Sequence, residues 1–249
     1  MRLDFLGIGF GRSASTWLTY CLYEHPEISI PKFNLETEIN YFPEEYEIMG
    51  LKNYIKKFLN CNFEKKVGEL STLIAHHERS PKLIKKLFPN TKIIIYYRDP
   101  KKRAESEYMM TKEFDLLEAN LEDLEYNQEE IVKRWVREFG KDNVFVFDME
   151  KREKKEQEKE LHRLFRFLGV KEITPPSFTR DSKAYREIER YTSNWANREK
   201  KIHRKPKSVF IRKTINYFKY KLRANKKLFY TIKRSFGIDY YFQWINRRI

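Results

Sequence analysis

The stretch FLGIGFGRSASTWLTYCL, at residues 5–22, decides how the rest of the chain is interpreted. It begins with an apolar run interrupted by Gly7 and passes through Gly9 and Gly11 into a polar turn. Apolar residues then fall at positions 17, 18, 21 and 22, a spacing typical of one helical face. The stretch therefore predicts a strand, a glycine turn and a helix.

The turn carries groups that bind oxyanions. Glycine lets the backbone approach a ligand closely, and the N–H groups at a helix start attract negative charge. Arg12, Ser13, Ser15 and Thr16 add a guanidinium and three hydroxyls that can donate to phosphate or sulfate oxygens. The alternative is an ordinary polar turn between a strand and a helix, because glycine-rich turns are common.

Two common nucleotide-binding motifs do not fit. The Walker A motif needs a glycine five residues before its Gly-Lys pair, whereas Leu6 stands at that distance from Gly11 and Arg12 replaces the lysine. The dinucleotide pattern G-x-G-x-x-G fails because Arg12 and Ala14 occupy the place of the third glycine. A kinase or NTPase would need the Walker lysine and a carboxylate for Mg²⁺ after a strand. Because the lysine is missing, a phosphotransferase is kept only as a rival function.

The segment GRSASTWL, at residues 11–18, resembles the 5′-phosphosulfate loop of sulfotransferases that use 3′-phosphoadenosine 5′-phosphosulfate (PAPS). That family writes the loop roughly as G-x-[KR]-S-G-T-[TS]-x-L. Ala14 stands where glycine is usual, and Arg12 stands where many members have lysine, although carbohydrate sulfotransferases often have arginine. The resemblance implies that PAPS is bound by Gly11, Arg12, Ser13, Ala14, Ser15, Thr16 and Trp17.

A second motif follows KIIIYY at residues 92–97, a continuous apolar run that predicts a central strand covered on both faces. RDPKKRAESEY, at residues 98–108, matches the family signature R-[DN]-P-x-x-R-x-x-S-x-Y at every fixed position. The resemblance implies that Arg98 and Ser106 hold the 3′-phosphate, while Arg103 and Tyr108 support the fold. An arginine suits this place, because ligands bind beyond strand ends in α/β sheets and guanidinium can hold phosphate bidentately.

The candidate general base is Glu38, in TEINYF at residues 37–42. It matches the glutamate of the family segment K-E-x-x-[FY]-F, but Thr37 replaces the lysine that helps to neutralise the sulfuryl group. That role must lapse or pass to another basic residue. The resemblance makes Glu38 and Arg12 catalytic: Glu38 deprotonates the acceptor for in-line attack on sulfur, and Arg12 stabilises the departing 5′-phosphate. A solvated loop carboxylate is the alternative for Glu38.

Two other segments add candidate residues. GELS, at residues 68–71, matches a G-E-x-S segment of the family, so Ser71 is a candidate for facing the acceptor and Glu69 for a structural hydrogen bond. Beyond Pro175-Pro176 the family has a loop that folds over the nucleotide, and Lys183 is the candidate there for a 3′-phosphate contact. The more specific basic triplets of that loop are absent.

Composition limits the class of protein. The chain has 249 residues, of which 41% are hydrophobic, enough for one domain with a full core. Its two cysteines indicate buried thiols in a reducing compartment. No signal peptide, membrane-spanning run or zinc-type spacing is apparent, so we expect a cytoplasmic protein without a metal site.

The net charge of +15 is uneven, because residues 180–249 hold 21 Lys and Arg against 5 Asp and Glu. We expect a catalytic domain at residues 1–195 and a basic, aromatic, helical C-terminal extension at residues 196–249. The apolar stripe within residues 200–249 could pack on the catalytic domain, lie on a membrane surface or dock a polyanionic acceptor.

The sequence therefore predicts a PAPS-dependent sulfotransferase with an α/β, P-loop-kinase-like, three-layer fold, in which helices flank a central, mainly parallel sheet. A glycan is the first acceptor class, from the Arg12 form of the loop and the carbohydrate-like Glu38 segment. A lipid or small metabolite comes next, and nucleic acid is not expected without a binding motif. The non-enzymatic rival is a basic adaptor that binds membranes or polyanions through residues 200–249 on a degenerate nucleotide-binding fold.

Overall fold

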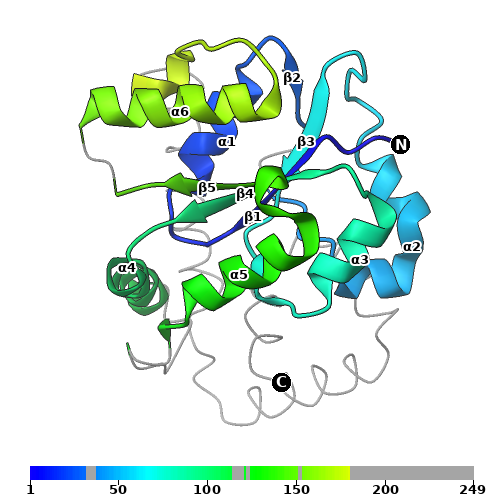
Figure 1. Cartoon of the computed structure of the whole chain (residues 1–249). Helices are drawn as coiled ribbons and strands as arrows, with labels where there is room; N and C mark the ends of the chain where they lie inside the picture. The colour runs from blue at the N-terminus through cyan, green and yellow to red at the C-terminus, as the bar shows by residue number, and fades with distance from the viewer. Residues whose placement is uncertain (32–37, 114–120, 122–123, 151–152, 180–249) are drawn as a thin grey trace, which may run out of the picture.

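A computed structural model describes residues 1–31, 38–113, 121, 124–150 and 153–179 (Figure 1). Three expectations from the sequence lie outside these described residues. They concern Thr37, Lys183 and the C-terminal extension.

The centre of the molecule is a sheet of five strands in the order β2-β3-β1-β4-β5. The strands are β1 (Phe5–Gly9), β2 (Ile28–Ser29), β3 (Lys66–Leu70), β4 (Lys92–Tyr97) and β5 (Val144–Asp148). All four pairings between these strands are parallel, which confirms the predicted sheet. In this register Phe5 lies opposite Gly68 on one side and Lys92 on the other.

Helices cover both faces of the sheet and complete the three predicted layers (Figure 1). One face is covered by α1 (Ser15–Tyr23) and α6 (Lys154–Leu168), and the other by α2 (Glu44–Lys56), α3 (Ser80–Leu87) and α5 (Gln128–Phe139). Helix α4 (Pro100–Glu113) follows β4. Short 3₁₀ turns are η1 (Ile74–His76), η3 (Lys141–Asn143) and η4 (Pro176–Thr179).

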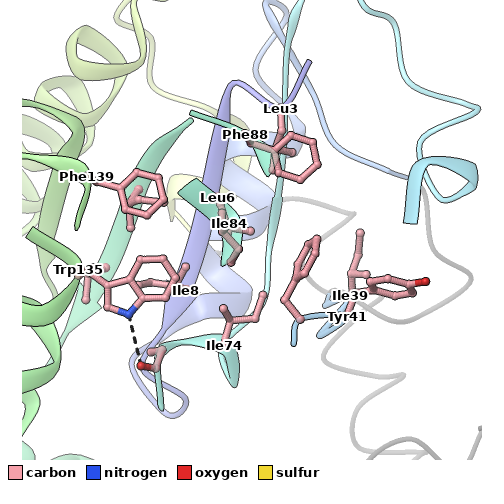
Figure 2. Packing of buried hydrophobic residues seen from close by; sticks show 14 of the residues in the cluster. Leu3, Leu6, Ile8, Ile39, Tyr41, Ile74, Ile84, Phe88, Trp135 and Phe139 are labelled. Atoms are coloured by element: carbon pink, nitrogen blue, oxygen red, sulfur yellow. Dashed lines mark hydrogen bonds between the residues drawn. The ribbon is translucent and has the colours of Figure 1, made fainter. Parts of the chain in front are cut away.

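Each face has its own apolar core, because alternate residues of a strand point to opposite sides. Leu6 and Ile8 of β1 pack toward α3 and α5, where Trp135 is fully buried (Figure 2). The Trp135 indole nitrogen donates a hydrogen bond of 3.3 Å to the carbonyl of Ala75, so its one polar atom is satisfied. Phe5 points the other way, into the core beneath α1 and α6.

Two helix boundaries have local features. Helix α2 ends at Lys56, and Leu59, just beyond it, is 77% exposed. Helix α5 begins at Gln128, because the Asn127 side chain accepts a hydrogen bond from the backbone N–H of Glu130 and caps the helix there.

The path of β1 out of the sheet positions the site. A Cβ on Gly7 would lie 1.7 Å from Tyr96 Oη, so glycine at this position leaves room for the buried Tyr96 side chain over β1. The register between β1 and β4 then shifts between Gly7 and Gly9, an irregularity of the β-bulge type. Beyond it the chain enters the polar turn that precedes α1.

Candidate active site

The candidate groups gather at one edge of the sheet. Because the strands are parallel, their carboxyl ends meet there, which is where ligands bind in open α/β sheets. The glycine turn follows β1, Thr72 comes shortly after β3, Arg98 follows β4 and Glu150 comes shortly after β5. Residues from four separate segments of the chain therefore converge.

Two residues of the glycine turn, Arg12 and Ala14, have left-handed backbone with φ of 66° and 52°. Ala14 directly precedes α1, at the position where the resembling loop has glycine. A non-glycine residue in this conformation costs roughly 1–2 kcal/mol. The geometry therefore explains why glycine is usual at this position and shows that the exchange for alanine carries backbone strain.

A cleft of about 570 Å³ opens at this edge. Its wall joins residues 12–17 of the turn to Arg98 and Ser106, so both predicted anion-binding motifs face one space. Gly11 is not part of the wall. The lining also includes residues that motif reasoning missed, namely Lys102, Met149, Glu150 and Gln157.

Hydrogen bonds tie the two motifs together. Arg12 donates from Nε and Nη2 to Ser106 Oγ at 3.3 and 3.1 Å. Arg98 donates from Nη1 to the backbone carbonyl of Arg12 at 2.8 Å, across 86 positions of sequence. These contacts bring two guanidinium groups and a hydroxyl to one part of the cleft, a set of donors suited to phosphate oxygens.

Ser13 provides a test of whether an oxyanion fits this turn. Its side chain is 1% exposed, and Oγ has no hydrogen-bond partner among the described residues. An unsatisfied buried polar group costs about 1–3 kcal/mol, which an incoming acceptor oxygen would recover. The turn therefore fits an oxyanion that offers an acceptor oxygen to Ser13.

Trp17 contributes mainly to the core beneath the cleft. It is 2% exposed, and its indole nitrogen donates to the carbonyl of Phe178 at 3.3 Å. Its ring packs edge-on against Phe147. Trp17 therefore forms part of the floor of the cleft, and its one polar atom already has a partner.

Glu38 is fixed by hydrogen bonds that all end on Oε2. Thr72 donates from Oγ1 at 2.6 Å and from its backbone N–H at 3.2 Å, and Asn40 donates from Nδ2 at 3.0 Å. Asn40 itself has left-handed backbone, with φ of 46°, and its Oδ1 accepts from the N–H of Leu73. The half-buried carboxylate is thus anchored through one oxygen rather than standing free in solvent.

A second carboxyl lies behind it. Glu69 is fully buried and accepts hydrogen bonds from Tyr54 Oη at 3.0 Å and Ser71 Oγ at 2.5 Å. Burial raises the pKa of Glu69 to about 7, against the opposing effect of these hydrogen bonds. Ser71 is also buried and accepts from the N–H of Asn40, so Ser71 and Glu69 both have structural contacts and Ser71 is closed off from solvent.

Thr72 links this carboxylate cluster to the glycine turn. Its Oγ1, the donor to Glu38, lies 3.8 Å from where a Cβ on Gly11 would stand. Its carbonyl lies 2.6 Å from the corresponding position on Gly9. The candidate base is therefore one hydrogen bond away from a residue that touches the anion-binding turn.

Other residues of the second motif serve the fold or were missed. Arg103 is 1% exposed, pairs with Glu107 and lies 4.1 Å from the centre of the Tyr126 ring, in keeping with its expected supporting role. Lys102 stands at a variable position of the signature, so the motif gave it no weight. Glu150 comes two residues after the end of β5. Because the carboxyl ends of parallel strands meet at one edge of the sheet, that position alone could have indicated that Glu150 lies near the ligand site.

Metal-ligand clusters and membrane-spanning helices are both absent from the described residues. No group of three or more His, Cys, Asp and Glu side chains could hold a metal ion in the parts of the chain that the structure describes. Among the same residues, no helix is long and apolar enough to cross a membrane.

The fold and the cleft define an α/β protein that can receive an anionic ligand at the carboxyl edge of its sheet. The family model described as "Sulfotransferase domain" matches residues 3–226, and the chain therefore belongs to the sulfotransferase family.

Relatives agree with this assignment. Over 143 residues the chain is 26% identical to "Membrane-associated sulfotransferase kil1" of Dictyostelium discoideum; the match covers 54% of this chain and 30% of that protein, less than a third of its length. A solved sulfotransferase from Alicyclobacillus acidocaldarius has a TM-score of 0.58 at 20% identity, covering 80% of this chain and 93% of the other. The sulfotransferase domain from the curacin biosynthetic pathway has a TM-score of 0.52 at 18% identity, and the match covers 72% of this chain and 77% of the other. These structures share the fold.

Proposed function

We propose that the protein transfers the sulfuryl group of PAPS to an acceptor hydroxyl or amine, with a glycan as the first acceptor class. The observation that carries this proposal is the meeting of Arg12, Arg98 and Ser106 in one cleft. PAPS carries a phosphosulfate on the 5′-oxygen and a phosphate on the 3′-oxygen of one ribose. The cleft offers donors for both, from the turn at residues 12–17 for the first group and from Arg98 and Ser106 for the second. PAPS supplies a sulfuryl group attached to a phosphate that can depart.

The two ends of the cleft have different tasks. Ser13 Oγ and the N–H groups at the start of α1 bind the phosphosulfate end, where the helix terminus also favours negative charge. Arg98 and Ser106 bind the 3′-phosphate, and Lys183 is proposed as a further contact. Arg12 reaches between these groups and stabilises charge on the departing phosphate, for which losing one such donor costs about 10²- to 10³-fold in rate.

Glu38 acts as the general base in this proposal. Its Oε2 is occupied by three hydrogen bonds, so Oε1 is the oxygen that takes the proton from the acceptor as that atom attacks sulfur. A positioned base contributes on the order of 10²- to 10⁴-fold. Asn40 and Thr72 keep the carboxylate in place while the proton moves.

The proposal also covers the acceptor, the domain division and the location. Arginine in the turn and the Glu38 segment favour a glycan over a lipid or small metabolite. We further propose a catalytic domain at residues 1–195 and a basic extension at residues 196–249 that contacts membranes peripherally from the cytoplasm. The Dictyostelium relative, described as membrane-associated, gives this contact some support.

Calorimetric titration with 3′-phosphoadenosine 5′-phosphate (PAP), the product nucleotide, tests the proposal on the full chain. We expect PAP to bind and Arg98→Ala to weaken it by about 10- to 100-fold, because hydrogen bonds to a charged group are lost. Arg79→Ala is the matched control: this arginine pairs with Glu47 at the surface, away from the cleft, and should leave affinity unchanged. No heat with the wild-type protein would contradict the proposal, as would an Arg98→Ala variant that binds normally.

A transfer assay addresses the acceptor. The protein is incubated with radiolabelled PAPS and a cell extract separated into glycan, lipid and small-molecule fractions. Label in the glycan fraction supports the first acceptor class. Label in another fraction reassigns the acceptor, and the absence of label from every fraction contradicts transfer.

A further inference from the structure

Glu150, which lies beyond β5, places a negative charge inside a cleft whose other charged lining residues, Arg12, Arg98 and Lys102, are all cations. Its Oε2 accepts a hydrogen bond from Lys102 Nζ, and its Oε1 lies 3.9 Å from Arg98 Nε. The same Oε1 accepts from the N–H of Asp99 at 3.4 Å. The carboxylate thus occupies the end of β4, where the 3′-phosphate is proposed to bind.

The backbone holds Glu150 in this position. Its N–H donates to Asp148 Oδ1 at 2.9 Å, which fixes the turn after β5. The hydrogen bond from Lys102 lowers the pKa of Glu150, an effect that outweighs partial burial, so the group stays ionised in neutral solution. A carboxylate held this way presents two oxygens to the cations, as a phosphate would.

Lys102 belongs to the same surface as the predicted phosphate ligands. It stands four positions before Ser106 on α4, and residues at that spacing share one face of a helix. Both line the cleft. Lys102 is therefore placed to provide a third cation or donor beside Arg98 and Ser106.

The ion pairs of Glu150 remain open to exchange. The side chains of Glu150, Arg98 and Lys102 are 27%, 32% and 41% exposed. Pairs this accessible contribute little to stability, so structural support alone is a weak reason for the arrangement. A phosphate dianion carries more charge than a carboxylate and can replace it.

We propose that Glu150 is a built-in competitor of the 3′-phosphate, which holds Lys102 and Arg98 until the nucleotide arrives and takes them back when the product leaves. This inference rests on the proposed function. Lys102 then becomes a 3′-phosphate ligand in the bound state. Glu150 weakens the binding of PAP and speeds its release.

The test compares two nucleotides that differ only in the 3′-phosphate. PAP and adenosine 5′-phosphate are titrated into the full chain and into Glu150→Gln, which keeps the size of the side chain but removes its charge. We expect PAP to bind about tenfold more tightly to the variant, because a competing carboxylate has been lost, and adenosine 5′-phosphate to change by less than about twofold.

Glu105→Gln is the matched control for net charge. Glu105 lies on α4 three positions beyond Lys102, is exposed and does not line the cleft. It should leave both affinities unchanged. An equal gain from both variants would assign the effect to the general field of the protein and overturn the inference.

Other outcomes separate the two proposals. If the wild-type protein binds PAP but Glu150→Gln does not bind PAP more tightly, only the inference about Glu150 fails. If the wild-type protein does not bind PAP at all, both this inference and the proposed function fail. If Glu150→Gln does not fold, the same two titrations on Lys102→Met test the inference instead. We expect Lys102→Met to weaken the binding of PAP about tenfold and to leave the affinity for adenosine 5′-phosphate unchanged. Equal effects on the affinities of both nucleotides would overturn the inference.

Discussion

Two polar clusters meet at the carboxyl edge of the sheet, and they satisfy their hydrogen bonds in opposite ways. In the cleft, Ser13 Oγ is buried without a partner among the described residues, and Arg12 bonds Ser106 at 3.1 and 3.3 Å. Around Glu38, by contrast, donors lie at 2.6 to 3.2 Å, and Glu69 behind it is fully enclosed. The first cluster is arranged to exchange partners with a ligand, and the second to hold a carboxylate still.

The largest expected effect tests the second cluster. Glu38→Gln keeps the shape and the acceptor oxygen but removes the basic group, so turnover with radiolabelled PAPS should fall by roughly 10²- to 10⁴-fold. PAP affinity, measured by calorimetry, should stay within about twofold, because this residue does not line the cleft.

The matched control is Glu47→Gln, a surface carboxylate that pairs with Arg79. It should retain full turnover. A Glu38→Gln enzyme that works within a few-fold of the wild-type rate would show that the base has been misassigned, and the functional contrast between the two clusters would disappear.

An intermediate effect concerns the enclosed carboxyl. Burial raises the pKa of Glu69 from its ordinary value of 4.5 to about 7. Between these values the folded protein keeps a proton that the unfolded chain has released, so the free energy of unfolding falls as pH rises through this window. Glu69→Gln cannot titrate and should lack this fall, which is on the order of 3 kcal/mol.

Urea unfolding at pH 5 and pH 7.5 measures the difference between wild type and Glu69→Gln. The advantage of wild type over the variant should shrink toward the higher pH. Parallel pH dependence of the two proteins would mean that Glu69 is not held protonated. Glu47→Gln should follow wild type, since its carboxyl is at the surface.

The smallest effect sharpens the description of the first cluster. Ala14→Gly removes the strain of a left-handed residue but makes the unfolded chain more flexible, so the free energy of unfolding should rise by about 0.5–1 kcal/mol. Thermal unfolding measures the gain. Ala104→Gly, in the interior of α4, should instead destabilise the protein by about 1 kcal/mol or more. If Ala14→Gly also lowers stability, strain in the turn is not significant.

Sequence patterns predicted the first cluster better than the second. Arg98 and Ser106 stand in a contiguous motif after an unmistakable apolar strand, and parallel pairing then forces that motif toward the glycine turn. Asn40 belongs to no pattern, because its role depends on left-handed backbone and on contacts with residues about 30 positions away. Non-local hydrogen bonds of this kind leave no periodicity to detect.

The same limit explains the other missed features. Lys102 and Glu150 are 48 positions apart and pair only because β4 and β5 are neighbours. The sequence predicted the strand at residues 92–97, but the adjacency of β4 and β5 requires the full strand order. Ser71 was a candidate for facing the acceptor because its motif gave no information on burial, and the structure encloses it.

Thr72 makes the two clusters mechanically dependent on each other. Its carbonyl sits against Gly9, its hydroxyl sits beside Gly11, and that hydroxyl and its N–H hold Glu38. A displacement of the turn is transmitted to the carboxylate through one short, β-branched side chain with little rotational freedom. The position of the Glu38 carboxylate and the shape of the glycine turn are therefore coupled through this one side chain.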